Sequence, residues 1–268
     1  MNILNADHLN FSTTIVQVFI FAIASFLHGI TGMSFPMIGT TSLSLVFPLP
    51  KAIAIIAFPS LIMNALVLLS NNEKGLVHEI LFYTKKYWIL ILASIVGCIV
   101  GIKLLLVVPV GVMYLIMSLV TFLYVASEYL SGKGLIRVFK ISTGIQNTLI
   151  FGFLAGIVGG ATNAMAPLLM MYLFSNTDDK HEIVKSSNIC YLFGKIIQIS
   201  FLGQNIINFN HQEITLIVWI TITSILFLFL GIKVRKNVSN QVFKNTIYII
   251  LLILSIKVGM SGINYLAL

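Results

Sequence analysis

Two lysines stand far inside apolar runs of the sequence. Lys195 lies about midway along the apolar segment 183–202, and Lys257 lies somewhat past the middle of the segment 245–264. The acidic residues all fall in polar stretches or near the ends of apolar ones, so neither lysine has a carboxylate at its own depth. An unpaired cation within an apolar segment is costly and is a functional hypothesis by default. The two lysines therefore predict a binding site for an anion.

Polar residues accompany Lys195 along one face of its segment. Asn188, Tyr191 and Gln198 stand seven and four residues before it and three residues after it, which are helical spacings. This stripe predicts the wall of a polar cavity. Gln198 and its counterpart Asn64 would line that cavity or hydrogen-bond neighbouring helices. Lys257 would bind the anion or extend its ammonium to the membrane interface.

Two helix-breaking stretches are the second candidate for chemistry. They read HGITGMSFPMIGTTSL (28–43) and GGATNAMAP (159–167). Irregular backbone at membrane depth is tolerated only when it is buried in protein or lines a wet cavity. Each break would start a half-helix near Pro36 or Pro167, and its free N–H groups would attract an anion. Ser34 and Asn163 are predicted as caps or ligand contacts.

These patterns define the predicted substrate site. Its residues are Gly29, Thr31, Gly32, Ser34, Asn64, Gly159, Gly160, Thr162, Asn163, Lys195, Gln198 and Lys257. His28 precedes the first break by one residue and is interpreted as a packed, hydrogen-bonded histidine, with proton coupling as the alternative. The histidines are scattered and show no metal-ligand spacing, so no metal and no cofactor are expected.

Composition sets the class of protein. The chain has 268 residues, of which 58% are hydrophobic and 9% are charged, with a mean hydropathy of +1.02. Soluble domains carry about 25% charged residues, so the chain is predicted to be a multi-pass protein of the lipid bilayer. The net charge of +8 does not indicate nucleic acid, because the basic residues cluster in short loops between apolar segments. Cys98 and Cys190 lie in apolar segments and are expected to be small packing residues.

The apolar segments predict an all-α polytopic membrane protein. Six of them, 52–70, 87–108, 110–130, 183–202, 213–232 and 245–264, approach the ~20 residues of a full span. Regions 11–49 and 143–175 are too long for one span and contain the two breaks, so each is predicted to form a broken hairpin with arms of roughly 11–18 residues. Residues 72–88 are predicted to include a short interfacial helix.

The two halves of the chain resemble each other. Thr31 and Thr162 each stand five residues before a proline, and Asn64 and Gln198 each lie thirteen residues beyond a lysine, Lys51 or Lys185. We therefore predict two repeats, residues 1–135 and 136–268, each with three full spans and one hairpin. Internal repeats of this kind are common in secondary transporters.

Loop charges predict the orientation of the repeats. If each broken region crosses the membrane once, six of the loop Lys and Arg residues lie on one side of the membrane and seven on the other. If each broken region returns to the side from which it enters, twelve lie on one side and Lys51 alone lies on the other. Cytoplasmic loops are enriched in these residues, so the second arrangement is preferred. It inverts the second repeat relative to the first and places both termini outside. The twelve are Lys74, Lys85, Lys86, Lys133, Arg137, Lys140, Lys180, Lys185, Lys233, Arg235, Lys236 and Lys244.

The motif GIVGGATNAMAPLLMMYL (156–173), its weaker copy GITGMSFPMIGTTSL (29–43) and the duplicated layout resemble the sulfite exporter TauE/SafE family. The first copy departs from the family pattern, because Met33, Ser34 and Phe35 stand where a glycine-rich run is expected. The resemblance implies transport of sulfite or organosulfonate-type anions across the bacterial inner membrane.

The sequence thus predicts a secondary transporter of small anions, and not an enzyme. An anion channel with the same site is the alternative. A membrane-embedded enzyme would need a nucleophile–base pair or a metal-ligand cluster, and an assembly protein for a metal cofactor would need more cysteines and histidines. The expected partners are a sulfur-containing anion and the lipid bilayer. A coupling ion (H+ or Na+) and a homodimer remain open.

Overall fold

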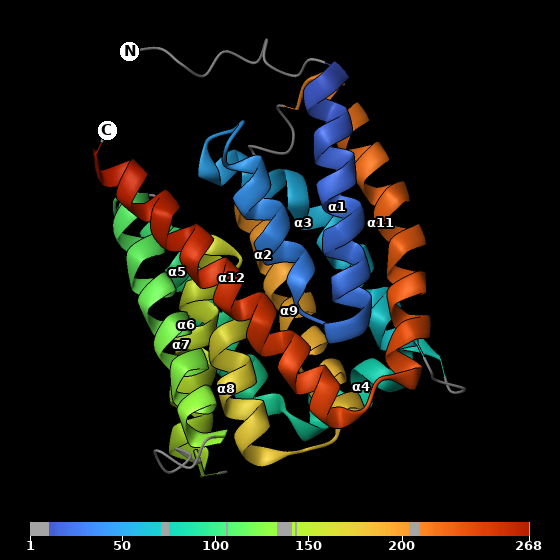
Figure 1. The fold of residues 1–268 in the computed structure, drawn as a ribbon, viewed down its shortest axis with the longest axis vertical. Coiled ribbons are helices and arrows are strands. Elements are labelled where there is room, and N and C mark those ends of the chain that lie inside the picture. Colours follow the sequence, from blue (N-terminus) through green and yellow to red (C-terminus); the bar gives the residue numbers. More distant parts are fainter. Residues whose placement is uncertain are drawn as a thin grey trace.

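A computed structural model describes residues 11–70, 75–105, 107–132, 141–142, 144–203 and 209–267. This part of the chain is helical and contains no strand (Figure 1). The predicted all-α membrane fold is therefore confirmed. Four of the basic loop residues used to orient the repeats lie outside the described residues: Lys74, Lys133, Arg137 and Lys140.

The six predicted full spans are all helices. They are α3 (Leu49–Leu69), α5 (Trp88–Leu105), α6 (Val110–Gly132), α9 (Lys180–Phe201), α11 (His211–Asn237) and α12 (Asn240–Ala267). The shortest has 18 residues and the longest 28, or about 27 to 42 Å at 1.5 Å per residue, against a hydrocarbon core of about 30 Å. Of these, α3, α5, α11 and α12 are long and apolar enough to cross a membrane, and so are the first arms of the two broken regions. Helix α11 continues past the predicted limit of 232, which brings Arg235 into its last turn.

The two broken regions form helical hairpins. The first joins α1 (Phe11–Thr31) to α2 (Ser34–Leu43), and the second joins α7 (Ile145–Thr162) to α8 (Ala166–Asn176). In the first, Ser42 Oγ donates to Gln17 Oε1 (2.8 Å), which places the end of α2 beside the start of α1. In the second, the hydroxyls of Thr148 and Tyr172 lie 2.8 Å apart. Each hairpin thus turns back to the end of the molecule at which it starts.

The hairpins point in opposite directions. The first starts at the end of the molecule where α1 begins and α12 finishes, here called the termini end (Figure 1). The second starts at the opposite end, beside α4 (Leu76–Lys86), here called the α4 end. The second arms have 10 and 11 residues, or about half the thickness of the hydrocarbon core.

The breaks fall later than the glycines suggested. Gly29 lies inside α1, and Gly159 and Gly160 lie inside α7; the helices are interrupted at 32–33 and 163–165. Gly29 and Gly160 instead allow close contact between helices. A Cβ on Gly160 would lie 2.3 Å from the Cys98 carbonyl oxygen of α5, and one on Gly29 would lie 2.4 Å from the Leu228 carbonyl oxygen of α11.

Helix packing follows the same pattern in both halves. Helix α5 packs along α7 as α11 packs along α1, and α3 pairs with α9 as α6 pairs with α12. Each of these contacts corresponds to another in the same set when the helices of one half are exchanged for those of the other. The outer helices expose apolar side chains such as Phe19, Leu119 and Leu226, whereas α3 and α9 are largely buried. The chain is therefore a multi-pass membrane protein with a buried central layer.

Helix α4 lies across the α4 end of the bundle and buries none of its residues. Val77 and Leu81 are 70% and 64% exposed, as expected for an interfacial helix. It is tied to α9 by ion pairs from Glu79 to Lys185 and from Lys86 to Glu182. Burial and the Glu182 carboxylate raise the pKa of Tyr87, so the Tyr87 hydroxyl remains protonated and donates to Glu182.

Candidate functional site

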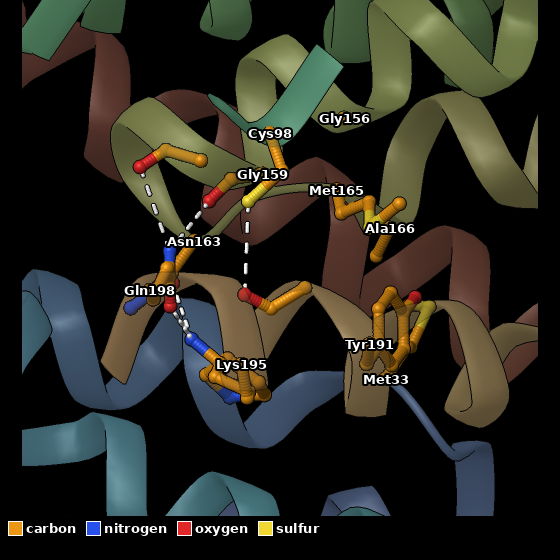
Figure 2. Close-up of a pocket in the computed structure, with 13 residues that line it drawn as sticks. Met33, Cys98, Gly156, Gly159, Asn163, Met165, Ala166, Tyr191, Lys195 and Gln198 are labelled. Carbon is orange, nitrogen blue, oxygen red and sulfur yellow. Dashed lines mark hydrogen bonds between the residues drawn. The ribbon is translucent and has the colours of Figure 1, made fainter. Parts of the chain in front are cut away.

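Lys195 lies at the tip of the second hairpin. Its side chain is buried, and its ammonium donates to Asn163 Oδ1 and to Gln198 Oε1 (2.6 Å) (Figure 2). Both acceptors are neutral amides, and the described residues place no carboxylate on Lys195. An ammonium has three N–H donors, so one is left for a ligand and the charge is not neutralised.

The backbone of the hairpin presents Asn163 to Lys195. Asn163 ends α7 in the left-handed conformation (φ 63°), which asparagine tolerates better than most residues. Gln198 fixes the same amide from the other side, because its Nε2 donates to Asn163 Oδ1 (2.8 Å) and to the Gly159 carbonyl (3.1 Å). The Lys195–Asn163–Gln198 cluster is therefore held rigidly by the tip of the hairpin.

A small cavity of about 20 Å³ lies beside this cluster in the present conformation, and both hairpins line it (Figure 2). Asn163 Nδ2 also donates to Thr40 Oγ1 of α2 (2.6 Å), so the two hairpins meet directly. The remaining walls are weakly polar. The lining residues are Met33, Pro36, Cys98, Gly156, Gly159, Gly160, Asn163, Met165, Ala166, Tyr191, Gly194, Lys195 and Gln198.

The structure brings five predicted site residues together at this cavity: Gly159, Gly160, Asn163, Lys195 and Gln198. The others are elsewhere. Lys257 lies on an exposed face of α12, as expected for a side chain that reaches toward the interface. Asn64 is fully buried on α3, and neither of its side-chain polar atoms has a hydrogen-bond partner.

The predicted residues of the first hairpin are mostly engaged with one another. Thr31 Oγ1 donates to the Leu27 carbonyl (2.7 Å) and lies 3.0 Å from Ser34 Oγ. His28 Nδ1 accepts from the Phe35 amide (3.4 Å), which is the packed, hydrogen-bonded role favoured for it. Gly32 has φ 76°, a conformation that favours glycine. In the second hairpin, Thr162 Oγ1 likewise donates to its own helix, at the Val158 carbonyl (2.7 Å).

The predicted capping roles are wrong for both hairpins. The N-cap positions of α2 and α8 are Met33 and Met165, and neither half-helix has a side-chain cap. Ser34 is already the first residue of α2 and faces Thr31, whereas Asn163 closes the preceding helix α7. In the first hairpin, His28 takes the Phe35 amide, which leaves that helix start less free to bind an anion.

Two ion pairs at opposite ends of the molecule were missed by the sequence reasoning. Lys51 of α3 pairs with Glu213 of α11 at the termini end, and Lys185 of α9 pairs with Glu79 of α4 (3.0 Å) at the α4 end. Each pair joins one half of the chain to the other. A signal was present, because Lys51 and Glu79 recur with the same spacing as Lys185 and Glu213.

Together the fold and this site define a polytopic membrane protein with a buried lysine between two opposed helical hairpins. The chain belongs to the sulfite exporter TauE/SafE family, whose family model matches residues 17–258. The chain is therefore assigned to a class of membrane transporters for sulfur-containing anions. Neither the curated proteins nor the solved structures gave a match.

Proposed function

We propose that this protein carries a small sulfur-containing anion, sulfite or an organosulfonate, across the bacterial inner membrane by alternating access, with the anion bound at Lys195. The observation that carries the proposal is the buried Lys195 ammonium, which has only neutral partners and lies in a cavity lined by both hairpins. A bound anion would neutralise the lysine and take its remaining N–H donor.

The lining of the cavity supports an anion of low charge. Lys195 is the only cation among the lining residues, and Met33, Cys98 and Met165 offer weakly polar walls. A second full negative charge would remain without a partner there and would be expensive to desolvate. Protonated sulfite or a sulfonate has a single negative charge, so it suits this site better than a dianion such as sulfate.

The two ion pairs supply a basis for alternating access. Lys51–Glu213 closes the termini end between α3 and α11, and Lys185–Glu79 closes the α4 end between α9 and α4. Both pairs are formed in this conformation. Opening the cavity to one end requires separation of the pair at that end, while the other pair keeps the opposite end closed.

The test is transport by purified protein in liposomes, with labelled sulfite, thiosulfate, sulfoacetate, taurine and sulfate as a panel. We expect saturable uptake of at least one sulfur-containing monoanion. The Lys195→Met variant should lose affinity by roughly 10- to 100-fold, which is the value of one charge-assisted hydrogen bond. Lys257→Met is the matched control, because it removes a lysine from a membrane helix outside the cavity, and it should transport normally.

Two results would overturn the proposal. Wild-type affinity in a folded Lys195→Met protein would remove Lys195 from the site. Fast, non-saturating conductance would identify the protein as an anion channel with the same cavity.

A further inference from the structure

We propose that the first hairpin carries a second site for a small oxyanion, with the Arg235 guanidinium as its cation. This inference takes the nature of the anion from the proposed function. The site would lie toward the α4 end, where Arg235 occupies the last turn of α11.

Arg235 is buried without a matching negative charge. Its side chain is 1% exposed, and Nη2 donates to Ser70 Oγ (3.0 Å). Its Nε and Nη1 atoms have no hydrogen-bond partner, and no described carboxylate forms an ion pair with it. Burying such donors without a hydrogen-bond acceptor is unfavourable. The Nε–H and Nη1–H groups face different sides of the guanidinium, and each is free to donate to an oxygen of a sulfur oxyanion.

Two further buried polar side chains, His28 and Asn188, belong to this region of the fold. His28 is fully buried next to the Asn188 side chain and within electrostatic range of Arg235. Because His28 Nδ1 accepts from the Phe35 amide, the neutral ring carries its proton on Nε2, which faces the Asn188 side chain. Asn188 donates to the Gly32 carbonyl at the tip of the first hairpin (2.8 Å), which places this group of side chains under that tip.

The repeat pattern gives independent support. Gly32 of the first hairpin and Asn163 of the second occupy equivalent positions, and both have left-handed backbone. Asn64 stands where Gln198 stands in the second half, and both of its side-chain polar atoms are unpartnered. Leu61 occupies the position equivalent to Lys195, so the cation at the first hairpin must come from another helix. Arg235 of α11 fulfils that condition.

The site would be linked to the ion pair at the α4 end. Lys185 donates to the Ser70 carbonyl (2.8 Å), Arg235 donates to the Ser70 hydroxyl, and Lys185 also pairs with Glu79. An anion on Arg235 would therefore lie beside the contact that closes this end. The Arg235 site would bind the anion transiently on its path between the α4 end and the central cavity.

The experiment is the stoichiometry of sulfite binding to purified protein, measured by equilibrium dialysis and calorimetry. We expect two sites in the wild type, one in Lys195→Met, one in Arg235→Gln and none in the double variant. Lys236→Gln is the matched control, because it removes the adjacent exposed charge, and it should keep both sites. Arg235→Lys keeps the charge at the buried position, and it should weaken the second site without abolishing it.

The outcomes separate this inference from the proposed function. One wild-type site that Lys195→Met abolishes and Arg235→Gln leaves unchanged would overturn the second site and retain the central one. If the wild type has a single site that Arg235→Gln abolishes and Lys195→Met leaves unchanged, the central site is overturned and the Arg235 site is retained. If Arg235→Gln fails to fold, the Lys195→Met protein decides alone, since the absence of binding there excludes an Arg235 site.

Discussion

At the scale of single residues, Asn163 has both a backbone and a side-chain role. Its φ of 63° closes α7, and its amide joins Lys195 to Thr40 of the other hairpin. Substitution can separate these roles, because glycine adopts the left-handed conformation freely and alanine does not.

We expect Asn163→Gly to fold with the turn intact and to lose anion affinity. Asn163→Ala should lose the same affinity and in addition about 1–2 kcal/mol of stability through backbone strain. Thermal unfolding in detergent and anion binding, measured on both variants, test this pair. Equal melting temperatures of Asn163→Gly and Asn163→Ala would show that Asn163 does not stabilise the protein through its left-handed backbone.

At the scale of helices, close glycine contacts fix the position of each hairpin. A Cβ on Gly160 would meet the α5 backbone at 2.3 Å, whereas a Cβ on Gly194 of α9 would meet nothing within 4 Å. Small residues of this kind are typical of interfaces between membrane helices.

Gly160→Ala should therefore destabilise the protein by about 1–3 kcal/mol. Gly194→Ala is the control within a helix and should be neutral or stabilising by about 0.5–1 kcal/mol, because alanine is the better helix former. Thermal unfolding measures both. A Gly160→Ala protein as stable as wild type would contradict the close packing of α7 on α5.

The two ion pairs make a further prediction at this scale, with Cys98 as a native reporter because it lines the cavity. Glu79→Gln should increase the labelling of Cys98 by a charged thiol reagent applied at the α4 end. Lys51→Gln should increase labelling from the termini end. A Cys190→Ser background confines the signal to Cys98, and the charge exchange Lys51→Glu with Glu213→Lys should restore protection. Labelling that does not depend on the side of application would contradict the two-gate mechanism.

The elements were largely predictable from the sequence, because span length, helix breaks and loop charge are local signals. The contacts between side chains of different helices could not be predicted from the sequence. Asn163 was recognised as a polar residue at the break, but its bond to Lys195 depends on how α7 and α9 pack. Arg235 was counted among the loop charges, yet α11 extends to Asn237 and buries it. Gly32 does lie at a break, whereas Gly160 and Gly29 lie within helices and contact α5 and α11.

At the scale of the whole molecule, the distribution of basic residues and the order of the helices predict the same orientation of the protein in the membrane. The described basic residues Lys85, Lys86, Lys180 and Lys244 lie in helix ends at the α4 end, and Lys51 lies near the termini end. Loops rich in Lys and Arg face the cytoplasm, so we predict that the α4 end is cytoplasmic and that both termini are outside.

Reporter fusions to the C-terminus test this orientation. Alkaline phosphatase should be active there, and a green fluorescent protein fusion should be dark. A fluorescent fusion would contradict the odd number of spans in each repeat. An alkaline phosphatase fusion in the α8–α9 connection at 177–179 is the internal control and should be inactive.

The central claim is that a small anion binds between the two hairpin tips on Lys195. The most direct measurement is a crystal structure with selenite, which replaces the sulfur of sulfite with an anomalous scatterer. We predict a selenium peak in the central cavity, with a selenite oxygen at about 3 Å from Lys195 Nζ, and a much weaker peak there in Lys195→Met crystals soaked at a concentration near the wild-type Kd. A cavity without selenium at concentrations that saturate binding would contradict the claim.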